Sequence, residues 1–191
     1  MKDVIIIVEG PQGVGKSTFT RYLREHMAAT DLHSLSGIKD KTEAGLTKIR
    51  VKYEKLIEYM ENCTDINMIF DRTFFTNEIY SRLGYNKHSF SETYNSLLQK
   101  LDNMKNIDNY DVYLVILYLK DEELYEQRIK RQKHQYQKFE AQSSIMQQRE
   151  YLKMADEVER QAKNIKVVRL ANDDEAVFEE NIQKYFGEYL K

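Results

Sequence analysis

Eight residues near the N-terminus, GPQGVGKS at Gly10–Ser17, restrict the possible folds of this chain more than any other stretch. They fit the pattern G-x-x-x-x-G-K-[ST] and follow the continuous apolar, β-branched run Val4–Val8. Such a run indicates a strand that is buried on both faces of a parallel sheet. The next residues, Ser17–Met27, have a helical pattern. A strand, a glycine-rich turn and a helix in this order predict a loop that binds phosphate groups.

Each fixed position of this loop has a physical reason. Gly10 and Gly15 let the backbone turn and approach phosphates closely, so that successive N–H groups form an anion nest at a helix N-terminus. Lys16 can reach the outer phosphates, and the Ser17 hydroxyl is a hard oxygen ligand that suits Mg²⁺. The residues expected to contact ATP are Gly10, Gln12, Gly13, Val14, Gly15, Lys16, Ser17 and Thr18. The alternative is a glycine-rich turn that binds no nucleotide.

The composition indicates one soluble domain around this loop. The chain has 191 residues, a single proline and no linker-like stretch or internal repeat, so we expect one domain, 1–191. Its 29 basic and 31 acidic residues give a formal net charge of −2, which provides no general attraction to nucleic acid or to an anionic membrane. No apolar run approaches the ~20 residues of a membrane span. The single cysteine, Cys63, excludes an internal disulfide. We therefore expect a cytoplasmic protein.

Strand and helix patterns alternate along the chain, which predicts βαβ units on a parallel sheet of about five strands with helices on both faces. This is a three-layer α/β fold of the P-loop NTPase type. The expected strands are Val4–Val8, Leu32–Leu35, Asn67–Phe70, Tyr113–Leu119 and Lys166–Leu170. The expected helices are Ser17–Met27, Thr42–Asn62, Thr73–Leu83 (with Gly84 as its C-cap), Ser91–Lys105, Glu122–Lys133, Ile145–Lys163 and Asp174–Leu190. The polar stretch Gln135–Ser144 favours neither state, and one sequence does not reveal the strand order.

A second cluster of candidate residues lies in DRTFFTNEIY, Asp71–Tyr80. Asp71 ends a short strand, where a carboxylate can hold Mg²⁺ or its water, so Ser17 and Asp71 are the expected metal ligands. The guanidinium of Arg72 can bind an anionic acceptor or the phosphoryl group in transit. The alternative is a surface Asp-Arg pair that ends an ordinary strand. The D-x-x-G and N-K-x-D motifs of GTPases are absent from the sequence, which makes a GTPase switch unlikely.

Three segments resemble the thymidylate kinase-like group of P-loop nucleoside and nucleotide kinases. VEGPQGVGKST, Val8–Thr18, is close to the group's opening E-G-x-x-G-x-G-K-S/T, and Asp71–Tyr80 resembles its D-R-Y-x-x-S-x-x-A-Y segment. LYLKDEELYEQRIKRQ, Leu117–Gln132, is similar to the group's strand, acidic turn and arginine helix that lead into a mobile lid, here about residues 128–145. The resemblance spans most of the chain. It implies ATP as phosphoryl donor, Mg²⁺ as cofactor and a homodimer.

The chain departs from this group mainly where the resemblance implies acceptor contacts. Counted back from Asp71 without a gap, Arg50 falls where thymidylate kinases have an arginine that contacts the acceptor base. Leu46, however, replaces the phenylalanine that stacks on the base. Gln12 stands where the group usually has an acidic residue, and Thr73 replaces the tyrosine after Asp-Arg. A solvated arginine on a helix is the alternative for Arg50.

The hypothesis that follows is transfer of the γ-phosphoryl group of ATP to a deoxynucleoside monophosphate, dTMP-like, which becomes the diphosphate. A monophosphate oxygen is already an anion, so the reaction needs alignment and charge neutralisation rather than a general base. The expected catalytic residues are Lys16, Asp71, Arg72, Arg128 and Arg131. Some members of the group place a catalytic arginine inside the loop, where this chain has Gly13. Arg128 and Arg131, three apart on one helical face, would then supply the cation from the lid. A solvated basic face is the alternative for both.

The residues expected to contact the acceptor are Glu9, Arg50, Arg72, Phe74, Phe75 and Tyr80. One of the two adjacent phenylalanines would give the base an apolar wall while the other lies in the core, and core positions for both are the alternative. Glu9 would orient the acceptor or a magnesium-bound water, or it is simply a polar strand end. A nucleoside kinase is an alternative function, in which Glu9 or Asp71 would act as a base on the neutral sugar hydroxyl. A nucleotide-binding module that signals to a protein partner is another.

Overall fold

The computed structural model describes residues 2–33, 40, 42–131 and 140–190. Within these residues, five parallel strands form one sheet in the order β2-β3-β1-β4-β5. The strands are β1 (Asp3–Glu9), β2 (Ala29–His33), β3 (Asn67–Asp71), β4 (Tyr110–Tyr118) and β5 (Ile165–Ala171). The first strand of the sequence therefore lies at the centre of the sheet, and the carboxyl ends of its two neighbours lie beside its own.

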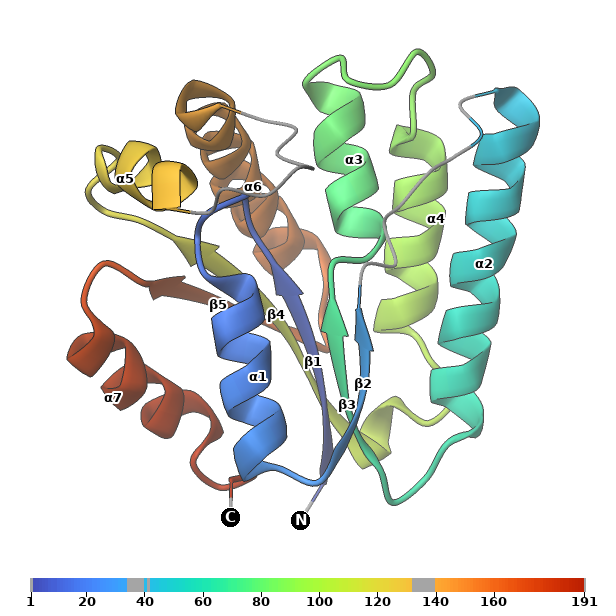
Figure 1. Cartoon of the computed structure of the whole chain (residues 1–191). Coiled ribbons are helices and arrows are strands. Elements are labelled where there is room, and N and C mark those ends of the chain that lie inside the picture. Colours follow the sequence, from blue (N-terminus) through green and yellow to red (C-terminus); the bar gives the residue numbers. More distant parts are fainter. Residues whose placement is uncertain (1, 34–39, 41, 132–139, 191) are drawn as a thin grey trace.

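Helices cover both faces of the sheet and complete three layers (Figure 1). The helices are α1 (Lys16–His26), α2 (Glu43–Asn62), α3 (Phe74–Arg82), α4 (Ser91–Asp102), α5 (Leu124–Arg131), α6 (Ala141–Gln161) and α7 (Glu175–Phe186), with a 3₁₀ turn η1 (Ile107–Asn109). Buried side chains of α1, α5 and α7 pack on one face, and those of α2, α3, α4 and α6 pack on the other. The expected α/β fold with a parallel sheet is confirmed.

The two faces of β1 explain its continuous apolar sequence. Successive side chains of a strand point to opposite faces. Ile5 and Ile7 accordingly pack under α2, α3 and α6, whereas Val4, Ile6 and Val8 pack under α1 and α7. All five are fully buried, so β1 is the central strand that the sequence pattern indicates.

Gly84 ends α3 as the sequence predicts. It has a left-handed conformation at φ 71°, and its N–H donates to the carbonyl of Ser81 at 3.0 Å. The N–H of Tyr85 donates to the carbonyl of Tyr80 at 2.8 Å, and the two rings meet edge to face. This is a Schellman motif with its usual apolar contact. It ends α3 at Arg82, with Leu83 as the C-cap and Gly84 directly after it.

Several boundaries differ from the sequence prediction. The second strand begins at Ala29, three residues before the predicted Leu32, because its register with β3 starts at Asn67, whereas the predicted end at Leu35 lies outside the described residues. The helix predicted to reach Lys105 ends at Asp102, whose carboxylate accepts the backbone N–H groups of Lys163 and Asn164. The last helix ends at Phe186 rather than Leu190, and α6 begins at Ala141, four residues before the predicted start. Residues 132–139 of the expected lid, 128–145, lie outside the described residues. Among those described, no helix combines the length and the apolar character needed to cross a membrane.

Candidate functional site

The predicted phosphate loop leaves the carboxyl end of β1 and leads into α1 (Figure 1). Gly10 has φ 142°, and a Cβ atom there would lie 2.7 Å from the carbonyl oxygen of Leu117 on β4. Gly15 has φ 100° and is the N-cap of α1, where a Cβ atom would collide with the side-chain amide of Asn172. Both positions need glycine because the backbone is left-handed and neighbours leave no room for a side chain.

Lys16 lies against the inner wall of this loop. Its ammonium group donates to the carbonyl oxygens of Gly10 at 2.7 Å and Pro11 at 2.5 Å. Burial, together with the nearby charge of Arg72, holds the pKa of Lys16 well below its ordinary value, although Asp71 and Glu9 oppose this shift. The side chain therefore lies buried and hydrogen-bonded to the loop at the place where the sequence predicts the phosphates.

A cavity of about 270 Å³ joins the loop to the segment after β3. It is lined by Gln12, Gly13, Gly15, Lys16, Ser17, Thr18, Asp71 and Arg72. The two segments meet because β1 and β3 are parallel neighbours, with Val8 paired to Asp71. The structure thus brings together the two clusters that the sequence singled out separately, including both expected metal ligands.

The pair Ser17 and Asp71 fits the chemistry of Mg²⁺. Both supply hard oxygen atoms to the same cavity. Mg²⁺ in kinase sites is usually bound by one or two protein oxygens together with substrate phosphates and water. Among the described residues, no group of three histidine, cysteine or carboxylate side chains forms a metal site by itself. A magnesium ion here would accordingly be bound jointly by the protein and the nucleotide.

Arg72 has a strained backbone. Its φ of 63° lies in the left-handed region, which costs energy for a residue with a side chain. Its N–H donates to the carbonyl of Val8 at 3.0 Å, which continues the sheet pairing by one residue. Burial disfavours the charged guanidinium, but its neighbours Tyr80, Tyr151 and Asp71 raise the pKa of Arg72 above the ordinary value. A strained, charged residue facing a cavity is a common feature of functional sites.

Glu9 lies fully buried beneath the start of α3. One carboxylate oxygen accepts the N–H of Thr73 at 2.6 Å and its hydroxyl at 3.1 Å, and the other accepts the hydroxyl of Thr76 at 2.6 Å. The hydroxyl of Tyr151 on α6 also donates to it at 3.4 Å. Burial raises the pKa of Glu9 to about 7, although the hydrogen bonds from Thr76 and Thr73 act against this. Glu9 therefore has the position of an anchor for α3, not of a residue exposed to the cavity.

The other expected acceptor residues occupy different environments. Phe74 and Phe75 are both buried in the core, with stacked rings 4.4 Å apart, which is the alternative that the sequence left open for them. Tyr80 is half-buried beside Arg72. Arg50 is on the outer side of α2, where its side chain is 51% exposed and lies 3.9 Å from Glu54. Arg50 lines none of the cavities described here.

Arg128 and Arg131 lie on the other side of the loop. Both line a second cavity, of about 550 Å³, between α1, α5 and α7. Arg128 donates to the carbonyl oxygens of Val14 at 3.3 Å and Asn172 at 2.5 Å, and Asn172 also donates to Val14 at 2.7 Å. Arg131 is exposed. Neither arginine lines the smaller cavity that contains Asp71 and Arg72.

Sequence reasoning missed two groups of polar residues, one that lines the larger cavity and one on α6. The first is Asn172, although a polar Asn-Asp-Asp run directly after a strand was a usable signal. The second is a row of buried polar residues on α6, at the helical spacing i, i+3, i+4 and i+7: Ser144, Gln147, Gln148 and Tyr151. Gln148 bonds both backbone groups of Leu119, whereas the amide nitrogen of Gln147 and the hydroxyl of Ser144 have no hydrogen-bond partner in the described structure.

Comparison with known proteins identifies the fold. No protein-family model and no curated protein matches the chain. Among solved structures, the YorR protein of Bacillus subtilis, in complex with phosphorylated GDP, is similar with a TM-score of 0.62 and 17% identity, over 96% of this chain and 97% of that one. Thymidylate kinase from Candida albicans has a TM-score of 0.58 and 14% identity, over 98% and 92% of the two chains. Deoxyadenosine kinase from M. mycoides with bound dATP has a TM-score of 0.57 and 16% identity, over 94% and 97%. The chain therefore has the fold of the thymidylate kinase-like P-loop kinases.

Proposed function

We propose that this protein transfers the γ-phosphoryl group of ATP to a deoxynucleoside monophosphate, with dTMP as the expected acceptor. The observation that carries the proposal is the small cavity in which Lys16 and Ser17 of the phosphate loop face Asp71 and Arg72. A loop that binds a triphosphate and a guanidinium that binds an anion then lie within the same enclosed space. The similarity of the fold to nucleotide kinases supports the proposal of a phosphoryl transfer between nucleotides.

The larger cavity suits the base of the donor. It adjoins the loop through Gly13, Gly15 and Thr18, and its far wall includes Phe178 of α7. Its volume of about 550 Å³ is within the range of small-molecule sites. We assign Arg128 and Arg131 to this donor side. Arg128 would hold the loop in place through its hydrogen bonds to Val14 and Asn172. Arg131, one turn further along α5, would bind the donor phosphates.

The environment of Glu9 favours a monophosphate over a nucleoside acceptor. A neutral sugar hydroxyl profits from a general base within hydrogen-bonding reach. Glu9 has both oxygens occupied by Thr73 and Thr76 and has no exposed surface. Deprotonation of the acceptor by Glu9 would require the residues that cover its carboxylate to move. A phosphate monoester needs no such base, because its oxygen is already charged.

In the proposed reaction the chain orients two anions and neutralises their charge. The backbone N–H groups after Gly13 and the ammonium of Lys16 bind the donor phosphates, and Arg72 binds the acceptor phosphate on the opposite side of the cavity. Ser17 and Asp71 would hold Mg²⁺, which neutralises charge on the donor phosphates when bound. Tyr80 lies beside Arg72. The protein forms no covalent intermediate in this scheme.

The proposal is tested by supplying purified protein with ATP and magnesium and, separately, each of the four deoxynucleoside monophosphates and each parent nucleoside. Release of ADP and chromatography of the products measure the transfer. We expect diphosphate from at least one monophosphate, most rapidly dTMP, and little product from nucleosides. A preference for nucleosides would establish the alternative, a deoxynucleoside kinase. Tight ATP binding without transfer to either would instead indicate a nucleotide-binding module.

Two further expectations remain proposals. The resemblance to thymidylate kinases suggests a homodimer, which light scattering on the purified protein measures directly. We also propose a cytoplasmic enzyme of nucleotide biosynthesis, which fractionation of cells that produce the protein tests.

A further inference from the structure

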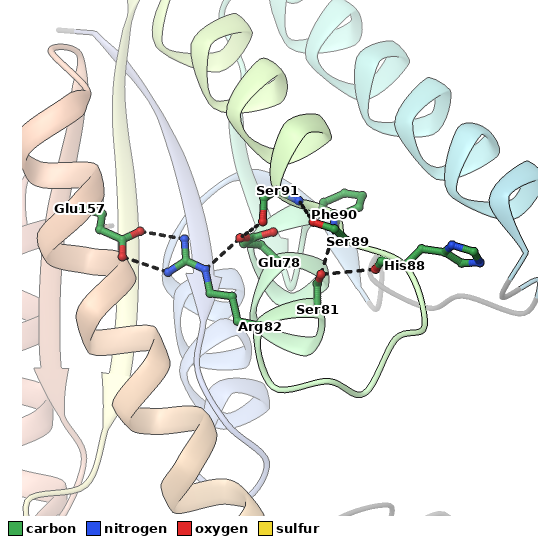
Figure 2. A network of polar contacts seen from close by, with 8 residues as sticks. All are labelled: Glu78, Ser81, Arg82, His88, Ser89, Phe90, Ser91 and Glu157. Carbon is green, nitrogen blue, oxygen red and sulfur yellow. Dashed lines mark hydrogen bonds and ion pairs between the residues drawn. The ribbon is translucent and has the colours of Figure 1, made fainter.

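A network of charged side chains joins α3 to α6 outside the site described above (Figure 2). Arg82, in the last turn of α3, donates from Nε to Glu78 at 2.8 Å. Its two terminal nitrogens donate to the two carboxylate oxygens of Glu157 on α6, at 3.0 and 2.7 Å. This forked geometry is the strong, directional form of an arginine–carboxylate pair. Glu78 is 1% exposed and also accepts the hydroxyl of Ser91 at the start of α4.

The same two helices meet again near the other end of α3. There Thr76 and Tyr151 of α6 share a hydrogen bond of 2.8 Å between their hydroxyls, next to Glu9. The helix α3 is consequently held to α6 at two places, one near each end, and α6 supplies Tyr151 and Glu157 to them. Residues 151 and 157 are six apart, nearly two turns of one helix.

The connection from α3 to α4 is tied to the same end of α3. The hydroxyl of Ser81 accepts the N–H of Phe90 at 2.9 Å and donates to the carbonyl of His88 at 3.4 Å (Figure 2). Together with the Glu78–Ser91 bond, these contacts place the C-terminal end of α3 in a continuous polar network. The network contains no residue of the candidate cavity. It holds the C-terminal end of α3, the helix that begins at Phe74, two residues after Arg72.

The length of α3 makes this control important. With nine residues, α3 is shorter than the ~12–15 residues at which isolated helices become marginally stable in water, so tertiary contacts must fix it. A nine-residue helix is about 13 Å long, and a tilt of roughly 10° about its start, which Glu9 holds, moves its other end, with Tyr80 and Arg82, by about 2 Å. A misplacement of ~1 Å can lower catalysis by about two orders of magnitude. The orientation of α3 thus decides where Tyr80, which lies beside Arg72, is placed.

We propose that Arg82 and Glu157 are positioning residues for the acceptor side of the reaction. Their ion pair locks the far end of α3 against α6, so that the anchor at Glu9 and the lock at Arg82 together fix the axis of α3 and the place of Tyr80 beside Arg72. The inference rests on the proposed function for its kinetic consequence, because Arg72 is assigned there to the acceptor phosphate. Its structural part, that the ion pair holds the last turns of α3, stands without that assignment.

The chain offers a matched control on the same helix. Arg169 of β5 donates to Asp156 at 2.6 Å and to Glu159 at 2.9 Å, both on α6. Its side chain is 28% exposed, against 23% for Arg82. Glu157 and Glu159 lie two residues apart and each accepts from an arginine, yet one joins α6 to α3 and the other joins α6 to β5. Any general effect of losing an ion pair on α6 should appear in both.

The experiment compares Glu157→Gln with Glu159→Gln in the full chain. Steady-state kinetics give KM for the acceptor monophosphate, KM for ATP and kcat, and hydrogen exchange measures the amides of residues 72–80. For Glu157→Gln we expect kcat/KM for the acceptor to fall roughly tenfold while KM for ATP stays within about a factor of two. We also expect faster exchange at 72–80, with the largest change toward Tyr80. Glu159→Gln should leave both readouts near the wild type, and Glu157→Asp should recover part of the loss.

Arg82 is tested by Arg82→Lys rather than by a neutral residue, because a neutral residue would leave the buried Glu78 without its cation, which is strongly destabilising. Lysine keeps the charge but cannot form the fork with Glu157, so the same acceptor-specific loss is expected. The inference is overturned if Glu157→Gln and Glu159→Gln change acceptor kinetics and exchange at 72–80 equally, or if neither changes them. Failure of the proposed function is a separate result, since it would appear as absence of monophosphate transfer by the wild type, and the exchange comparison would still decide the inference.

Discussion

The carboxylate of Glu9 accepts the backbone N–H of Thr73 at 2.6 Å and so joins the residue before the phosphate loop to the residue after Arg72. The two halves of the candidate site are thereby linked through one buried side chain. Because Glu9 also bonds Thr76, the first turn of α3 is attached directly to the central strand β1. A substitution at Glu9 should therefore disturb the acceptor side more than the donor side.

Glu9 should make stability depend on pH. A buried carboxyl group with a pKa of about 7, compared with 4.5 ordinarily, binds its proton more tightly in the folded state. The folded state is favoured by this group below pH 4.5, and that contribution is lost as pH rises through 7, by up to about 3 kcal/mol. Glu9→Gln should remove this dependence, so that the variant gains stability relative to the wild type between pH 4.5 and 8. Denaturant unfolding of both proteins at several pH values measures the difference, and parallel pH profiles would contradict the assignment.

Arg72→Gly should separate stability from activity. Glycine adopts φ 63° without strain, so the variant should match or exceed the stability of the wild type by up to about 1 kcal/mol. Without the guanidinium, kcat/KM for the acceptor should fall by roughly 10²-fold or more. Thermal unfolding and steady-state kinetics on the same preparation test both statements. Retained transfer in this variant would remove Arg72 from the proposed mechanism.

Arg128→Ala should act on the donor. Since Arg128 bonds Val14 and Asn172 on the outer side of the loop, its loss should raise KM for ATP by about tenfold and change kcat much less. Asn172→Ala, which removes the second brace on Val14, should behave similarly. The opposite pattern, a large fall in kcat at unchanged KM for ATP, would support the direct lid role that the sequence suggested for Arg128.

Gln147→Met should stabilise the ligand-free protein. A buried amide nitrogen without a hydrogen-bond partner costs about 1–3 kcal/mol, and methionine fills a similar volume without it. Gln147 lies one turn from Tyr151 toward the carboxyl edge of the sheet, so the acceptor is a candidate partner for this nitrogen. We expect greater stability together with weaker acceptor binding. Greater stability with unchanged acceptor kinetics would exclude that role.

Lys16→Met should abolish transfer without unfolding the chain. The ammonium is buried and held by Gly10 and Pro11, so its removal takes away both a desolvated charge and the cation nearest the expected phosphates. We expect kcat to fall by at least about 10²-fold, and the melting temperature to stay the same or rise. The variant also serves as the inactive control for the acceptor survey.

The sequence was sufficient for the features that depend on local patterns. The apolar run before Gly10, the glycine spacing and the residues after β3 identified the loop and its partner segment, because parallel strands end at the same edge of a sheet. The sheet order required the structure, since nothing in one sequence states that β1 lies between β3 and β4. The boundaries of β2 and α4 depended on tertiary contacts, such as the bonds of the Asp102 carboxylate, that local patterns do not contain.

The candidate site was less predictable than the fold. Glu9 was expected near the acceptor, and its direction became clear only from the positions of Thr73 and Thr76 one turn into α3. Arg128 was expected over the phosphates, yet α5 packs so that this side chain meets Val14 from outside. In both cases the residue type and its neighbourhood in the sequence were informative. The direction of the side chain came from helix packing, which the sequence does not specify.

The two cavities touch the loop from different sides and have Gly13, Gly15 and Thr18 as their common boundary. A donor entering past α7 and an acceptor entering past α3 would not obstruct each other. Under the proposed function, either substrate can then arrive first and either product can depart first. The initial-rate patterns should intersect, as they do for a ternary complex, and the enzyme should not exchange phosphate with ATP in the absence of an acceptor.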